Sequence, residues 1–238
     1  MLELVLAASA TALATGIGAI PVWLLGDRAT TLQPALTGVA GGVMAVAAVQ
    51  GLLIPAAREG TAADVAAGLA MGVVFLLAVR AWLGRPTERV QRAGGSALII
   101  FIVLLVHSLP EGFAIGTAYA SETEGLASFV VIAIAIQNIP EGTSVAIPMA
   151  AAGVGRSRQF WAAVLTSVPQ PIGAVIAYFL VEEITGLLPL SFAFAAGAML
   201  MLVVSELGPP EPGVRGRWLV GALAGAAVMA ALGAALGA

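Results

Sequence analysis

Two nearly identical six-residue segments carry the side chains that could do chemistry in this sequence. The first is His107-Ser108-Leu109-Pro110-Glu111-Gly112, and the second, Gln137-Asn138-Ile139-Pro140-Glu141-Gly142, follows at an offset of 30 positions. In each copy the first residue and the glutamate are four positions apart, which places them on one face of a helix. Together the two faces offer an imidazole, an amide oxygen and two carboxylates, a mixed set suited to Zn²⁺, Fe²⁺ or Mn²⁺. We therefore predict a metal site built from both copies.

The proline and glycine of each copy suit two helices that bend and pack closely. Pro110 and Pro140 lack a backbone N–H, so each frees the carbonyl four residues earlier and favours a kink. The glycine after each glutamate allows another backbone to approach. These features predict kinked helices around the site. The alternative is that the repeat is a coincidence of kinked helices, with each glutamate protonated and hydrogen-bonded.

The composition places these polar residues in an unusually apolar chain. Of 238 residues, 60% are hydrophobic and 10% are charged, and the mean hydropathy is +1.04. A soluble domain carries roughly 25% charged residues, so this chain is predicted to be an all-α membrane protein. The absence of cysteine excludes disulfides and thiolate metal sites.

Eight apolar runs are long enough to cross a bilayer, which takes roughly 20 residues. We expect one transmembrane domain over residues 1–238, an eight-transmembrane-helix bundle with kinked fourth and fifth helices. The predicted spans are Leu4–Leu25, Gln33–Ala57, Ala63–Leu83, Ser96–Ala120, Leu126–Ala151, Phe160–Val181, Leu187–Leu207 and Arg217–Ala238.

The arginines predict the orientation of these spans. With the N-terminus outside, nine of the ten arginines fall in inner loops and only Arg58 falls outside. Basic residues favour the cytoplasmic side, so we expect a multi-pass protein of the cell membrane with both termini outside. The inner arginines are Arg28, Arg80, Arg85, Arg89, Arg92, Arg156, Arg158, Arg215 and Arg217.

We single out three carboxylates inside the apolar runs. Glu111 and Glu141 belong to the repeat, and Glu206 lies near the inner end of the seventh span. An ionisable group inside the bilayer is costly and therefore points to function. We expect Glu206 to relay a cation between the buried site and the cytoplasm, the alternative being an acid that reaches the headgroups.

The short turn between the fourth and fifth spans predicts the depth of the repeat. His107 and Gln137 each lie 15 residues from residue 122 in that turn, roughly 22 Å along a helix. We expect these two residues at one depth, and Glu111 and Glu141 together at another, both near the middle of the membrane.

The paired segments resemble the ZIP (Zrt-, Irt-like protein) family of divalent metal transporters, in its prokaryotic form. The family has a His-x-x-Pro-Glu-Gly element in its fourth helix and a related element in its fifth. The resemblance extends to Thr15–Pro21, Ala40–Met44 with Leu52–Pro55, Gln170–Ala174 and Ala195–Met199 through Glu206. It implies eight helices with both termini outside and uptake of zinc, iron, manganese or cadmium toward the cytoplasm.

Position by position, the resemblance implies a primary site of His107, Glu111, Gln137 and Glu141. A side chain of the second helix, Gln50, is the candidate to complete it. Many members have histidine where this chain has Gln137. The positions that match a second adjacent metal are all neutral here, so we expect one metal; they are Ser108, Asn138 and Gln170.

Other functions fit the buried carboxylates less well. A lipid-phosphate hydrolase would need cationic groups at its site, and no arginine lies near the repeat. A cation channel lined by carboxylates stays open as an alternative, whereas a membrane scaffold needs no buried histidine and glutamate. We expect the metal to be a substrate rather than a cofactor, and no nucleic-acid partner.

Glycines four positions apart include the pairs Gly38 and Gly42, Gly68 and Gly72, and Gly221 and Gly225. Such pairs can form the interface of a homodimer or pack helices within one chain. The abundance of glycine favours internal packing, and a homodimer stays open.

Overall fold

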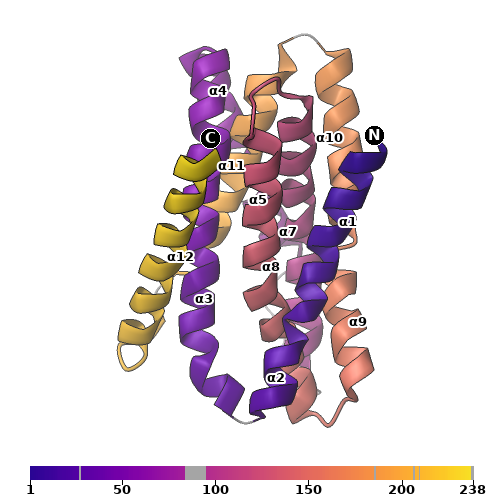
Figure 1. Cartoon of the computed structure of the whole chain (residues 1–238), viewed down its shortest axis with the longest axis vertical. Coiled ribbons are helices and arrows are strands. Elements are labelled where there is room, and N and C mark those ends of the chain that lie inside the picture. The colour runs from indigo at the N-terminus through magenta and orange to yellow at the C-terminus, as the bar shows by residue number, and fades with distance from the viewer. Residues whose placement is uncertain (27, 84–94, 185, 206, 209, 237–238) are drawn as a thin grey trace.

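The protein is an all-α bundle whose longer helices run along one axis (Figure 1). This computed structural model describes residues 1–26, 28–83, 95–184, 186–205, 207–208 and 210–236, with side chains except those of residues 80, 82–83 and 95–104. No strand occurs among these residues. The all-α fold predicted from the sequence is therefore confirmed.

Helices make up most of the described residues. In chain order they are α1 Leu2–Ile17, α2 Ala19–Leu25, α3 Arg28–Val46, a π-helical segment Ala47–Leu53, α4 Ile54–Glu59, α5 Ala62–Leu83, α7 Gly95–Ala120, α8 Leu126–Ala151, α9 Arg156–Thr166, α10 Pro169–Glu183, α11 Leu187–Ser205 and α12 Arg215–Leu236. Seven segments within the described part of the chain are long and apolar enough to cross a membrane. The count of eight spans and the kinks stay predictions.

Three predicted spans are interrupted, and in each a proline follows the interruption. Pro21 cannot donate to the carbonyl of Ile17, where α1 ends and α2 begins after Gly18. Before Pro55 the second span widens into the π-helical segment, and before Pro169 the sixth span breaks between α9 and α10. Pro110 and Pro140, by contrast, lie inside the uninterrupted helices α7 and α8.

Three pairs of helices make the most extensive contacts: α3 with α12, α5 with α11, and α7 with α10. Glycines bring each pair together, because an added Cβ would collide with a backbone carbonyl of the partner helix. The three glycine pairs named from the sequence are used in this way, at Gly38, Gly42, Gly68, Gly72, Gly221 and Gly225. These faces therefore pack helices within the chain, as small residues do in membranes, and a homodimer stays a prediction.

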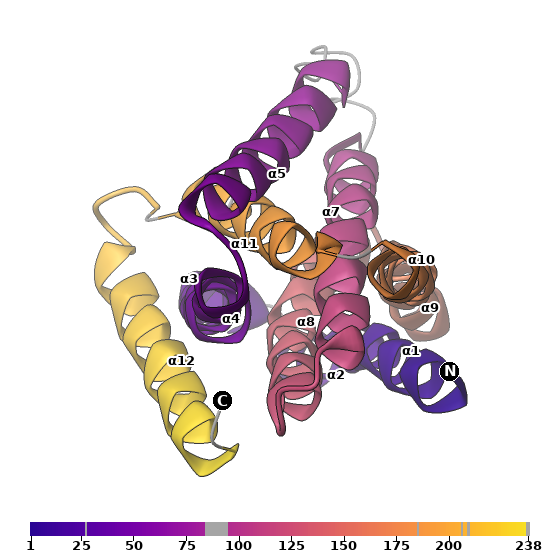
Figure 2. The same ribbon diagram turned by 90° about the horizontal axis from the view of Figure 1, so that it is seen from above.

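The helices α7 and α8 lie in the middle of the bundle, and α5 and α12 lie at its edge (Figure 2). The helix α8 contacts α1, α3, α7 and α9. Its residues Gln137, Asn138 and Glu141 are buried by these neighbours. Both copies of the repeated segment are thus held where lipid and water are excluded.

The two termini lie toward the same end of the bundle, and the connections from α2 to α3 and from α8 to α9 lie at the other end (Figure 1). Arg28 begins α3 and Arg156 begins α9 at that second end. This arrangement agrees with the separation of arginines from the termini that the sequence predicts.

We predict that Gly221→Ala destabilises the bundle by about 1–3 kcal/mol, since an overpacked contact cannot relax cheaply. The added methyl group would collide with the carbonyl oxygen of Ala35 on α3. Gly216→Ala on the same helix is the matched control, because a Cβ there meets no atom within 4 Å. Thermal unfolding of the purified proteins in detergent measures the difference, and equal midpoints would contradict the proposed contact.

Candidate metal centre

The repeated segments place their polar side chains on facing turns of α7 and α8. His107 and Glu111 lie one turn apart on α7, and Gln137 and Glu141 lie one turn apart on α8. All four side chains are buried, with exposures between 0% and 4%. The structure therefore brings together all four members of the predicted primary site.

Three of these residues form a compact cluster of possible metal ligands. One ligand atom from each of His107, Glu111 and Glu141 lies within 4.8 Å of the other two. Nitrogen and oxygen ligands bind Zn²⁺ at about 2.0–2.2 Å, so atoms this close together can reach one ion. The cluster thus has the donor types and the spacing of a site for a divalent cation.

The side chains pair across the two helices in a way that differs from the expected equal depths. His107 Nε2 lies 3.5 Å from Glu141 Oε2, and Gln137 Nε2 donates a hydrogen bond to Glu111 Oε1. Each glutamate thus pairs with the first residue of the other copy. The expected equal depth of the glutamates was wrong, because Glu111 lies about 11 residues before residue 122 and Glu141 about 19 residues after it. In antiparallel helices the order of the two polar residues along the bundle is reversed between the copies.

Two oxygen atoms of the site remain without a hydrogen-bond donor among the described residues. They are Gln137 Oε1 and Glu141 Oε1, and both are buried. A buried acceptor left unsatisfied costs about 1–3 kcal/mol, more if it is charged. A cation bound between α7 and α8 would offset this cost for both atoms.

Asn138 and Gln170, predicted from the family resemblance, lie beside the cluster and bond to each other. Asn138 Nδ2 donates to Gln170 Oε1 at 3.2 Å, and Gln170 Nε2 donates to Glu111 Oε2 at 2.5 Å. Ser108 is also buried, next to His107 on α7. The structure therefore places Gln170 against a glutamate of the cluster through its amide nitrogen, which cannot bind a metal.

No hydrogen bond in the described structure joins the predicted residue Gln50 to the cluster. Gln50 lies in the π-helical segment, and its Oε1 faces α12, where a Cβ added at Gly233 would come within 2.7 Å. No hydrogen-bond donor reaches that oxygen from the described residues. Glu206 lies outside the described residues.

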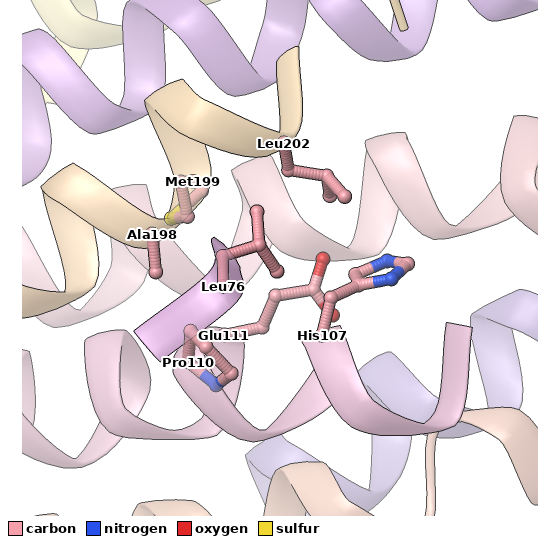
Figure 3. Close-up of a pocket in the computed structure, with 7 residues that line it drawn as sticks. All are labelled: Leu76, His107, Pro110, Glu111, Ala198, Met199 and Leu202. Carbon is pink, nitrogen blue, oxygen red and sulfur yellow. The ribbon is translucent and has the colours of Figure 1, made fainter. Parts of the chain in front are cut away.

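A narrow gap opens beside His107 and Glu111 (Figure 3). Apart from these two residues its walls are apolar, and they come from α5, α7 and α11. The gap has no room for a water molecule. The cluster is therefore dry on this side, which strengthens electrostatic attraction for a cation. The apolar lining residues are Leu76, Pro110, Ala198, Met199 and Leu202.

Thr11 on α1 also lies beside the site and was not predicted from the sequence. Its hydroxyl lies 2.9 Å from Gln170 Oε1, and its carbonyl oxygen accepts a hydrogen bond from Asn138 Nδ2 at 2.7 Å. A threonine among the apolar residues of the first span was the available signal. Only the packing of α1 against α8 and α10 gives it a place beside the site.

The charges around the site favour metal binding over phosphate chemistry. Every arginine whose side chain the structure describes is exposed, whereas the cluster is buried. Stabilising a transferring phosphoryl group requires cations close to it. The described part of the chain therefore offers acidic ligands for a cation and no cationic clamp for a phosphate.

Comparison with known proteins gives one consistent result. The family described as ZIP zinc transporter matches residues 84–233, which contain both repeated segments. Zinc transporter GufA of Myxococcus xanthus is 32% identical over 214 residues, covering 82% of this chain and 83% of that protein. Zinc transporter ZupT of Corynebacterium aurimucosum is 37% identical over 146 residues, 60% of this chain and 55% of that protein.

A third relative comes from an animal. Zinc transporter ZIP11 of Bos taurus is 36% identical over 136 residues, which cover 53% of this chain and 40% of that protein. The family match covers more than half of the chain, and the similarity to GufA extends over most of both proteins. The chain therefore belongs to the ZIP family of zinc transporters.

Proposed function

We propose that this protein carries Zn²⁺ and related divalent cations across the cell membrane, toward the cytoplasm, through the buried cluster between α7 and α8. The observation that carries the proposal is the approach of His107, Glu111 and Glu141 ligand atoms to within 4.8 Å of one another. Carboxylates placed so close together inside an apolar bundle repel each other, and a divalent cation offsets that repulsion. The protein is not proposed to be an enzyme.

The donor set supports zinc as the principal substrate. One imidazole with carboxylate and amide oxygens suits Zn²⁺, and it also accommodates Fe²⁺, Mn²⁺ and Cd²⁺. The related proteins from Myxococcus xanthus and Corynebacterium aurimucosum are named zinc transporters. Within the proposal the metal is the substrate, and the residues that bind it are His107, Glu111, Gln137 and Glu141.

The proposed membrane orientation is supported by the ends of the helices. Arginines begin α3, α9 and α12, which favours a cytoplasmic location for those helix ends. The termini are then outside. Glu206 is proposed to receive the cation on its way from the cluster to the cytoplasm.

The narrow gap beside the cluster supports a carrier rather than an open channel. A channel needs a continuous wet path, whereas the gap next to His107 and Glu111 has no room for water. We therefore expect a conformational change to open this side of the site before the ion moves.

We predict that Glu141→Ala abolishes metal uptake into proteoliposomes while the protein still inserts and purifies. The substitution removes one of two buried charges that balance the cation, and no other described acidic side chain joins the cluster. Isotope uptake measures the effect, and Glu141→Gln separates the loss of charge from the loss of volume. The matched control is Glu124→Gln, because Glu124 is exposed before α8 begins. If Glu141→Ala takes up metal at the same rate as Glu124→Gln, the proposed metal site is wrong.

We predict one tightly bound cation for each chain. Glu111 and Glu141 balance one divalent cation, and the neighbouring amides of Asn138 and Gln170 are neutral and bonded to each other. A second ion would therefore leave uncompensated charge at low dielectric. Calorimetry with Zn²⁺ or Cd²⁺ on purified protein should give a stoichiometry near one. Two ions at near full occupancy at low metal concentration would contradict the charge argument.

We predict that uptake saturates as the metal concentration rises, because each ion must wait for the closed site to open. Initial rates over a range of Zn²⁺ concentrations in proteoliposomes test this. A flux that rises in proportion to concentration, without saturation, would favour the channel.

A further inference from the structure

The carboxylate of Glu111 is held on both sides by amide nitrogens. Its Oε1 accepts a hydrogen bond from Gln137 on α8, and its Oε2 accepts one of 2.5 Å from Gln170 on α10. Hydrogen bonds to an ionised acceptor are about twice as strong as neutral ones. Glu141 differs, because its Oε1 has no hydrogen-bond donor among the described residues. The two glutamates of the cluster are therefore restrained to different degrees.

The amide of Gln170 is itself fixed by two neighbours. Asn138 Nδ2 donates to Gln170 Oε1, and Gln170 Nε2 lies 3.4 Å from Asn138 Oδ1, so the two amides pair reciprocally. The Thr11 hydroxyl lies 2.9 Å from the same Gln170 Oε1 and 2.8 Å from the Ala8 carbonyl oxygen, so its one proton is shared between these two acceptors. Reversing the Gln170 amide would turn its carbonyl oxygen toward the Glu111 carboxylate, acceptor against acceptor. The network therefore directs the Gln170 nitrogen at Glu111.

Asn138 is tied to the backbone as well as to Gln170. Its Nδ2 donates a 2.7 Å hydrogen bond to the carbonyl oxygen of Thr11. Thr11, Asn138 and Gln170 are all 0% exposed. Three helices, α1, α8 and α10, thus contribute one polar side chain each to a dry network that ends on Glu111.

The backbones of α7 and α10 are brought together at the same place. A Cβ at Gly112, directly after Glu111, would collide with the carbonyl oxygen of Gln170, and a Cβ at Gly173 would come within 2.7 Å of the Leu109 carbonyl oxygen. Glycine on both helices therefore sets the short distance across which Gln170 reaches Glu111. The contact is built by main-chain packing as well as by side-chain hydrogen bonds.

We propose that Gln170, oriented by Asn138 and Thr11, is a positioning residue that holds Glu111 for the transported cation. Gln170 keeps Oε2 on the α10 side and leaves Oε1, on the α8 side, as the oxygen that binds metal. Gln170 itself does not ligate, because its amide oxygen faces Thr11 and Asn138. This inference rests on the proposed function of the cluster as the metal site.

Removal of the Gln170 amide tests the proposal. Gln170→Leu should raise the Kd for Cd²⁺ about 10-fold or more, because a hydrogen bond to a charged group is lost. Thr11→Val keeps the shape of the side chain and touches neither Glu111 nor the cation. It should raise the Kd by a smaller factor, roughly twofold to tenfold, by loosening Gln170. Calorimetry on purified protein gives both values, and the visible spectrum of bound Co²⁺ should change in Gln170→Leu as the geometry of the ligands relaxes.

Thr117→Val is the matched control. Thr117 on α7 makes a buried 2.6 Å hydrogen bond to Ser191 on α11, so this variant also loses an interhelical bond, away from Glu111. Its Kd should stay within about twofold of the wild-type value even where the thermal midpoint falls. A weakening in Thr117→Val equal to that in Gln170→Leu would show that general loosening is responsible and would overturn the proposal.

The remaining outcomes separate the two proposals. Loss of Cd²⁺ binding in Glu141→Gln together with an unchanged Kd in Gln170→Leu would overturn the positioning role alone. Wild-type binding in Glu141→Gln would instead remove the metal site on which the role rests. If Gln170→Leu does not fold, Thr11→Val carries the test, and an unchanged Kd in that variant overturns the proposal.

Discussion

Two carboxylates buried in the middle of an apolar bundle impose the main constraint on this structure. A charge in hydrocarbon costs at least a few kcal/mol unless it is paired or hydrogen-bonded. Glu111 meets this requirement with two amide donors, whereas Glu141 has His107 at 3.5 Å and one oxygen without a donor among the described residues. The protein itself therefore supplies hydrogen-bond donors to both oxygens of Glu111. One oxygen of Glu141 is left without a donor among the described residues and can accept an incoming cation. This imbalance is what a site that must both bind and release an ion requires.

The rest of the bundle makes this arrangement possible through close helix packing. Lipid provides little hydrophobic drive for helices to associate, so small residues and polar contacts hold them together. Glycines bring α7 to α10 at Gly112 and α1 to α8 at Gly18 and Gly142, where an added Cβ would strike a carbonyl oxygen. The same close packing carries Thr11 and Gln170 to the cluster. The scaffold and the site thus depend on the same contacts.

Much of this architecture was predictable from the residues. The apolar runs gave the helices to within a few residues, and for α8 both predicted ends, Leu126 and Ala151, agree with the structure. The interruptions at Gly18 and before Pro169 were not predicted. Hydropathy measures how apolar a segment is and does not record that proline lacks a backbone N–H donor. The antiparallel order was available from the short turn between α7 and α8. Its consequence, the pairing of His107 with Glu141 and of Gln137 with Glu111, became clear only from the structure.

The sequence by itself determined which groups could bind a cation and that they lie in a membrane. The spacing of His107 and Glu111 on one helix face, and of Gln137 and Glu141 on another, follows from local helical geometry. Local geometry does not specify which face of one helix meets which face of another. Only the tertiary structure therefore decided that Gln170 donates to Glu111, that Thr11 and Asn138 orient it, and that the Gln50 amide oxygen lies against α12. Those contacts join residues more than 25 positions apart, and they form because glycines let particular helices approach.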